Sequence, residues 1–107
     1  MSAITESAAG QKCQIRVPGI CEWEHCVLAH YRAMGTCGAG MKPPDMQGAY
    51  ACVPCHDEVD SRMHRSGFSR AELRHMHAEG VMRSQLIMQR AGLIVTAEDA
   101  RPPKADV

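Results

Sequence analysis

The sequence predicts an α+β domain, and three observations carry that prediction. Two short apolar runs, residues 27–31 and 49–52, have the length of strands and are separated by a stretch rich in glycine and proline. Two pairs of cysteines lie on either side of these runs. Further along, Ser69 and Glu72 form the S-x-x-E capping-box pattern that marks the start of a long C-terminal helix.

The length of 107 residues predicts one domain. We expect it to span residues 12–97, between disordered tails at 1–11 and 98–107, because both ends lack apolar periodicity. Aromatic residues are only 4% of the chain, so a metal cross-link would help to stabilise a thin core. Net charge is zero, so overall charge gives no support for a nucleic-acid partner. Residues 61–97 do carry six arginines against two glutamates, which suits either phosphate contact or an ordinary solvated helix face.

Four cysteines predict a structural zinc site. Cys52 and Cys55 form a C-x-x-C pair, and Cys13 and Cys21 lie at the two ends of a hairpin-like segment that turns at residues 18–19. No N-terminal signal peptide is evident and no run is long enough to span a membrane, so we expect a cytoplasmic protein with reduced thiols. Cys26 is an alternative ligand. A c-type haem or thioredoxin-like interpretation of the C-x-x-C pair lacks the export signal or the βαβ context that it requires.

The remaining elements follow in order. The strand at 27–31 carries His30 near its end, and the strand at 49–52 leads into Cys52. Between them, residues 32–48 predict a flexible loop, with a glycine-lined phosphate nest as an alternative. A helix over 54–64 places His56 and Asp60 on one face at i, i+4. The last helix begins after Ser69 and stops near residue 92; within it, Gly80 marks either a close-packing point or a division into two helices.

This order of motifs resembles the zinc-containing HNH branch of the ββα-metal (His-Me finger) nucleases, and more closely the YbcO-like family of small prophage-encoded nucleases. The stretches that carry the resemblance are CQIRVPGIC (13–21), LAHYR (28–32), CGAGMKPPD (37–45), ACVPCHD (51–57) and EGV (79–81). It covers residues 9–92. The resemblance implies a zinc-stapled ββα-metal core with a long C-terminal helix, and a DNA endonuclease activity.

The resemblance also gives the histidines roles that phosphodiester hydrolysis requires. His30 is the candidate general base, and His56 is the candidate ligand of a catalytic Mg²⁺ or other divalent cation, with Asp45 or Asp60 as the oxygen donor. His56 is alternatively a zinc ligand. DNA is the implied partner, with branched or recombination intermediates as candidate substrates and a homodimer as a candidate assembly.

Two departures from the family pattern favour a second interpretation. The residue before His30 is Ala29 rather than a metal-binding residue, and the chain contains no Asn for the middle position of the motif, where Gln47 lies nearby. The alternative to an enzyme is therefore a zinc-stapled module of phage origin that binds DNA or protein without cleaving it.

Overall fold

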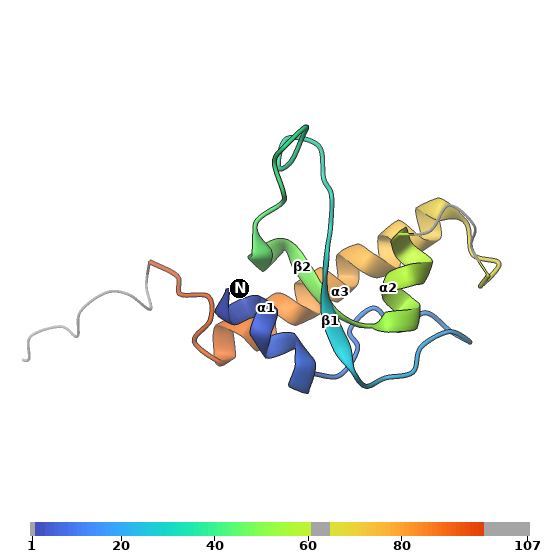
Figure 1. Ribbon diagram of the computed structural model, residues 1–107, viewed down its shortest axis with the longest axis horizontal. Helices are drawn as coiled ribbons and strands as arrows, with labels where there is room; N and C mark the ends of the chain where they lie inside the picture. The colour runs from blue at the N-terminus through green and yellow to red at the C-terminus, as the bar shows by residue number, and fades with distance from the viewer. Residues whose placement is uncertain (1, 61–64, 98–107) are drawn as a thin grey trace, which may run out of the picture.

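The structure is a computed structural model, which describes residues 2–60 and 65–97 (Figure 1). It confirms the α+β class: within these residues, a two-stranded antiparallel sheet is combined with three α-helices, the last of them long. The elements in chain order are α1 (Ala3–Ser7), the 3-10 helix η1 (Ala8–Gly10), β1 (Cys26–His30), the 3-10 helix η2 (Asp45–Gln47), β2 (Gly48–Cys52), α2 (Val53–Asp60) and α3 (Arg70–Arg90).

The β1–β2 hairpin has small residues where a helix must approach it. Cys26 pairs with Cys52 at one end and His30 pairs with Gly48 at the other. Three alanines in the hairpin are fully buried, and their methyl groups leave room for α3, which passes behind the sheet in Figure 1. They are Ala29, Ala49 and Ala51.

Two buried polar contacts fix α3 against the hairpin. The backbone N–H of Tyr50 donates to Ser84 Oγ over 2.9 Å, and His77 Nε2 donates to the carbonyl oxygen of Ala29 over 2.9 Å. Each satisfies a polar group that would otherwise be costly to bury. They therefore set the position of the helix along the sheet as well as stabilising it.

Gly80 is the point at which α3 meets the N-terminal part of the chain. A Cβ atom at this position would lie 3.0 Å from the carbonyl oxygen of Gln14 and 3.1 Å from Ile15 Cγ1. The helix runs unbroken through Gly80. Of the two interpretations of this glycine, close packing is the correct one.

The helix boundaries agree with the local capping chemistry. The capping box at Ser69 and Glu72 is formed, and Gly92 follows the end of α3 with a φ of 77°. The predicted helix over 54–64 is observed as α2, Val53–Asp60, and its remaining predicted residues lie outside the described part of the chain. Along the described residues, no helix has the length and apolarity needed to cross a bilayer.

The N-terminal segment, which we expected to be disordered, is folded. Ser2 caps α1 by accepting from the N–H of Thr5, and Ala8 is buried at 2% exposure. Ser7 Oγ lies 2.7 Å from the hydroxyl oxygen of Tyr50 in β2. A five-residue helix is too short to show apolar periodicity, so its stability comes from this docking rather than from its own sequence. The predicted C-terminal tail, 98–107, lies outside the described residues.

Candidate metal centre and histidine–carboxylate pairs

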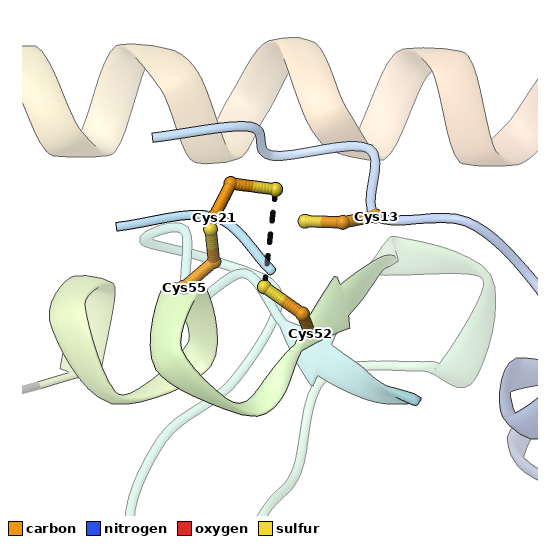
Figure 2. Close-up of side chains that lie close together, drawn as sticks. All are labelled: Cys13, Cys21, Cys52 and Cys55. Carbon is orange, nitrogen blue, oxygen red and sulfur yellow. Dashed lines mark hydrogen bonds between the residues drawn. The ribbon is translucent and has the colours of Figure 1, made fainter. Parts of the chain in front are cut away.

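Four cysteines from separate parts of the chain converge on one point (Figure 2). Cys13 and Cys21 come from the loop before β1, Cys52 is the last residue of β2, and Cys55 lies in the first turn of α2. Their Sγ atoms all lie within 4.8 Å of one another. Three of the four side chains are fully buried and Cys21 is half-buried. The predicted set of four is thus brought together.

The separation of the Cys21 and Cys52 sulfurs is close to the sulfur–sulfur distance in a tetrahedral zinc site. With Zn–S bonds of about 2.3 Å, two sulfurs in a tetrahedral site are about 3.8 Å apart. The Sγ atoms of Cys21 and Cys52 are 3.9 Å apart, far beyond the length of a disulfide. Backbone N–H groups also point at the cluster: that of Arg16 at Cys13 Sγ over 3.5 Å, and that of Glu22 at Cys52 Sγ over 3.3 Å. Such donors favour the thiolates that a metal requires.

The thiol pKa values reflect how closely the sulfurs share protons. A hydrogen bond with Cys55 lowers the pKa of Cys13 to about 4, assisted by the backbone N–H of Arg16. The same hydrogen bond, together with burial, raises the pKa of Cys55. Burial raises the pKa of Cys21 to about 11. Cys13 is thus held as a thiolate beside protonated Cys21 and Cys55, and metal binding would release the protons of these two thiols.

The wide spacing from Cys13 to Cys21 is closed by a turn that sequence patterns do not reveal. Arg16 lies in the left-handed region with a φ of 59°. Its guanidinium stacks over the Trp23 ring at 5.1 Å, and its Nε donates to the carbonyl oxygen of Cys13. The N–H of Cys13 in turn donates to the carbonyl oxygen of Trp23 over 2.8 Å. These contacts compensate the strained backbone at Arg16 and aim Cys13 inward.

The two alternative zinc ligands are not part of this cluster of described residues. Cys26 lies opposite Cys52 in the hairpin, but its thiol points toward the carbonyl oxygen of Trp23 at 3.8 Å. Burial raises its pKa to about 12, which keeps it protonated. His56 is paired with Asp60 instead, at 2.8 Å between Nε2 and Oδ2.

His30, at the end of β1, forms its own pair with Asp45. Its Nε2 lies 2.7 Å from Asp45 Oδ1, and both side chains remain partly exposed. The other oxygen of Asp45 accepts hydrogen bonds from the hydroxyls of Ser2 and Thr5. The bond from Ser2, followed by that from His30, holds the pKa of Asp45 below its usual value. The folded N-terminal segment therefore anchors this carboxylate.

The two histidine–carboxylate pairs lie on different elements. The Tyr31 ring meets the edge of the His77 ring at 5.1 Å, and the charges of His56 and Asp60 act on His77. The His56–Asp60 pair therefore lies near His77 of α3, whereas the His30–Asp45 pair contacts Ser2 and Thr5 of the N-terminal segment. Asp45 and Asp60, the two candidate carboxylates, are thus each paired with a different histidine.

Three further residues, Gln47, Arg74 and Arg83, have structural contacts that spacing alone did not reveal. The amide of Gln47 donates to the carbonyl oxygen of Tyr31 and to Thr36 Oγ1, both over 2.7 Å, and so closes the base of the loop after His30. Arg74 stacks over the Tyr31 ring at 4.6 Å. Arg83 donates to the carbonyl oxygen of Gln14. Part of the predicted arginine-rich face thus holds the fold together.

Comparison with known proteins places the chain in a single family. Residues 2–93 match the family model described as "Putative nuclease YbcO". Proteins of that name from Escherichia coli K-12 and from Enterobacteria phage 82 are each 41% identical over 98 residues, covering 88% of this chain and 98% of theirs. A solved structure described as a "putative bacteriophage protein" from Escherichia coli K-12 superposes with a TM-score of 0.68 at 37% identity, covering 82% of this chain and 98% of that one.

Proposed function

Since this chain belongs to the family described as "Putative nuclease YbcO", we propose that it is a metal-dependent DNA endonuclease of the HNH type. The observation that carries the proposal is the His30–Asp45 pair at the exposed end of β1, combined with the family membership. A histidine held by a carboxylate is a standard arrangement for removing a proton from water.

In this proposal, His30 is the general base. Its Nε2–H donates to Asp45 Oδ1, which leaves Nδ1 free to take a proton from the attacking water. The ionised Asp45 orients the ring and stabilises the imidazolium that forms. Ser2 and Thr5 keep Asp45 in place and ionised, because their hydroxyls donate to it.

The proposed catalytic cation belongs to His56 and Asp60. Their side chains already lie together on one face of α2, and imidazole with carboxylate is a donor set that divalent metals accept. A cation such as Mg²⁺ held there would stabilise the charge that develops on the phosphate. We assign Asp60 rather than Asp45 to this role, since Asp45 is engaged by His30. The zinc on the four cysteines would be structural, joining the loop before β1 to the start of α2.

A metal-dependent cleavage assay tests the proposal. Plasmid nicking with Mg²⁺, Mn²⁺ or Ni²⁺ should fall at least about 100-fold in His30→Ala and His56→Ala, as expected for loss of a general base or a metal ligand. His75→Ala is the matched control, since His75 forms a similar i, i+4 pair with Glu79 on the exposed side of α3. Equal activity of the wild type and His30→Ala would reject the proposed role.

A second candidate function is a zinc-stapled module that binds DNA without cutting it. Ala29 gives no metal ligand beside His30, and the His56–Asp60 pair is carried by α2 rather than by β1. Binding with no cleavage in any of the three metals would establish this function instead. A panel of single-stranded, duplex and branched DNA tests the proposed preference for recombination intermediates, and sedimentation tests the proposed homodimer.

A further inference from the structure

The connection between β1 and η2 forms a projecting finger, residues 31–44. In Figure 1 it extends away from the sheet and the helices, and it begins directly after His30. We had expected a flexible loop here. Several hydrogen bonds lie within this segment.

The hydrogen bonds of the finger lie at its tip and toward its base. At the tip, the N–H of Gly38 donates to the carbonyl oxygen of Met41 over 3.2 Å, and the N–H of Met41 donates back over 3.0 Å. Gly40 completes this tight turn with a φ of 75°. Lower down, the N–H of Thr36 donates to the carbonyl oxygen of Ala33 over 3.0 Å, and Gln47 closes the base. These hydrogen bonds favour one shape of the finger, and a segment that keeps its shape loses less entropy on binding.

The finger presents two apolar side chains to solvent. Met34 is 102% exposed and Met41 is 63% exposed. A side chain as exposed as Met34 contributes no burial to the fold, so folding does not account for an apolar residue there. Unbranched, polarisable methionine side chains adapt readily to a partner surface.

The charges around these methionines point to a nucleic acid as that partner. Residues 31–44 include no Asp or Glu, whereas Arg32 and Lys42 are both basic and exposed. Arg74 lies at the base of the finger, where its guanidinium donates to the Tyr31 hydroxyl over 2.9 Å. Basic residues flanking exposed apolar side chains suit a phosphate backbone on the outside and bases within.

We propose that the finger inserts Met34 and Met41 between base steps of DNA that is already interrupted by a gap or a branch. Apolar wedges of this kind must pay for unstacking, which costs a few kcal/mol per step in an intact duplex and less where stacking is already broken. The finger would thus select the DNA structure and bring it beside His30. This inference rests on the proposed function in taking DNA as the substrate.

Binding measured separately from cleavage tests the inference. Fluorescence anisotropy, without added Mg²⁺, Mn²⁺ or Ni²⁺, would compare the zinc-loaded full chain on an intact duplex, a gapped duplex and a three-way junction. We expect the wild type to prefer the two interrupted DNAs. Met34→Ala combined with Met41→Ala should weaken binding to them by about tenfold or more, the factor expected from loss of buried side chains. Binding to the intact duplex should change little.

A matched variant and a charge variant give the comparison its controls. Met82→Ala removes a methionine that is 66% exposed on α3, outside residues 31–44, and should leave all three affinities unchanged. Lys42→Ala should weaken binding to all three DNAs alike and reduce the salt dependence. Thermal unfolding of each variant verifies that the fold is intact.

Several outcomes would overturn the inference. These are equal binding of the wild type to intact and interrupted DNA, no binding to any DNA, or equal effects of the finger double variant and Met82→Ala. Self-association that disappears in the double variant would assign the finger to a second copy of the chain instead. If the wild type cleaves DNA and the Met34/Met41 double variant binds as the wild type does, only this inference is refuted. If binding depends on the two methionines but no DNA is cleaved, only the nuclease proposal is refuted.

Discussion

Replacing Gly80 by Ala should destabilise the domain, although alanine is the better helix former. In an unobstructed helix interior this change gains about 1 kcal/mol. Here the new methyl group would meet three atoms of Gln14 and Ile15 at 3.0, 3.1 and 3.2 Å. All three distances are shorter than ordinary van der Waals contact. Such overpacking costs about 1–3 kcal/mol.

The upper part of that cost applies because the obstructing atoms cannot easily move. Two of the three atoms are backbone atoms of Gln14, which follows Cys13. The N–H of Gln14 donates to the carbonyl oxygen of Tyr50 over 2.7 Å, and its carbonyl oxygen accepts from Arg83. We therefore expect a net loss of about 1–2 kcal/mol in the free energy of unfolding, after the gain in helix propensity is subtracted. Urea unfolding of the zinc-loaded protein measures it directly.

Gly10→Ala is the matched control. A Cβ atom at Gly10 would meet nothing within 4 Å, and the backbone there is not in the left-handed region. The same chemical change should therefore be neutral or stabilise by up to about 1 kcal/mol. If Gly80→Ala proved as stable as the wild type or more so, the packing argument at this crossing would be wrong.

Three further predictions concern the metal centre and the buried polar groups. Cys55→Ser should reduce zinc, measured by elemental mass spectrometry, from about one ion per chain to less than half, whereas Cys37→Ser, outside the cluster, should retain it. Burial lowers the pKa of His77 below its ordinary value of 6.5, so the unfolded chain binds the extra proton first and stability falls as pH drops below 6.5. His77→Gln should remove that part of the pH dependence, seen as urea midpoints that vary less between pH 7.5 and 5.5. Ser84→Ala should cost about 1–3 kcal/mol in urea unfolding, because the buried N–H of Tyr50 loses its acceptor; no change would show that another group accepts it.

Predictions from sequence were correct where a residue type at a given spacing is compatible with few local structures. The cluster of four cysteines and the capping box at Ser69 were predicted correctly, and the two strands were predicted to within one residue at each end. Each depends on local geometry or on donor chemistry that few other arrangements provide. Gly80 was recognised as exceptional for the same reason, since glycine inside a helix requires an explanation.

The features that escaped prediction depend on contacts between distant parts of the chain. Nothing in the sequence near Ser2 indicates that its hydroxyl contacts Asp45. The N-terminal segment is folded because Ser7 docks against Tyr50, which is also distant in sequence. Similarly, the left-handed backbone of Arg16 has no sequence signal, because glycine or asparagine would be the usual choice. The pairing of His30 with Asp45 likewise joins residues 15 positions apart, which spacing alone did not indicate.

The contacts of α3 with Gln14 and Tyr50 join the two ends of the domain, and this constrains the order in which the chain can fold during translation. The four cysteines leave the ribosome well before Gly80 and Ser84 of α3. During that time the β1–β2 hairpin is not yet covered by this helix. Late, non-local contacts of this kind slow folding. The nascent chain therefore passes through an interval in which its cysteines are open to oxidation, and an early supply of zinc with a reducing environment should raise the yield of folded protein.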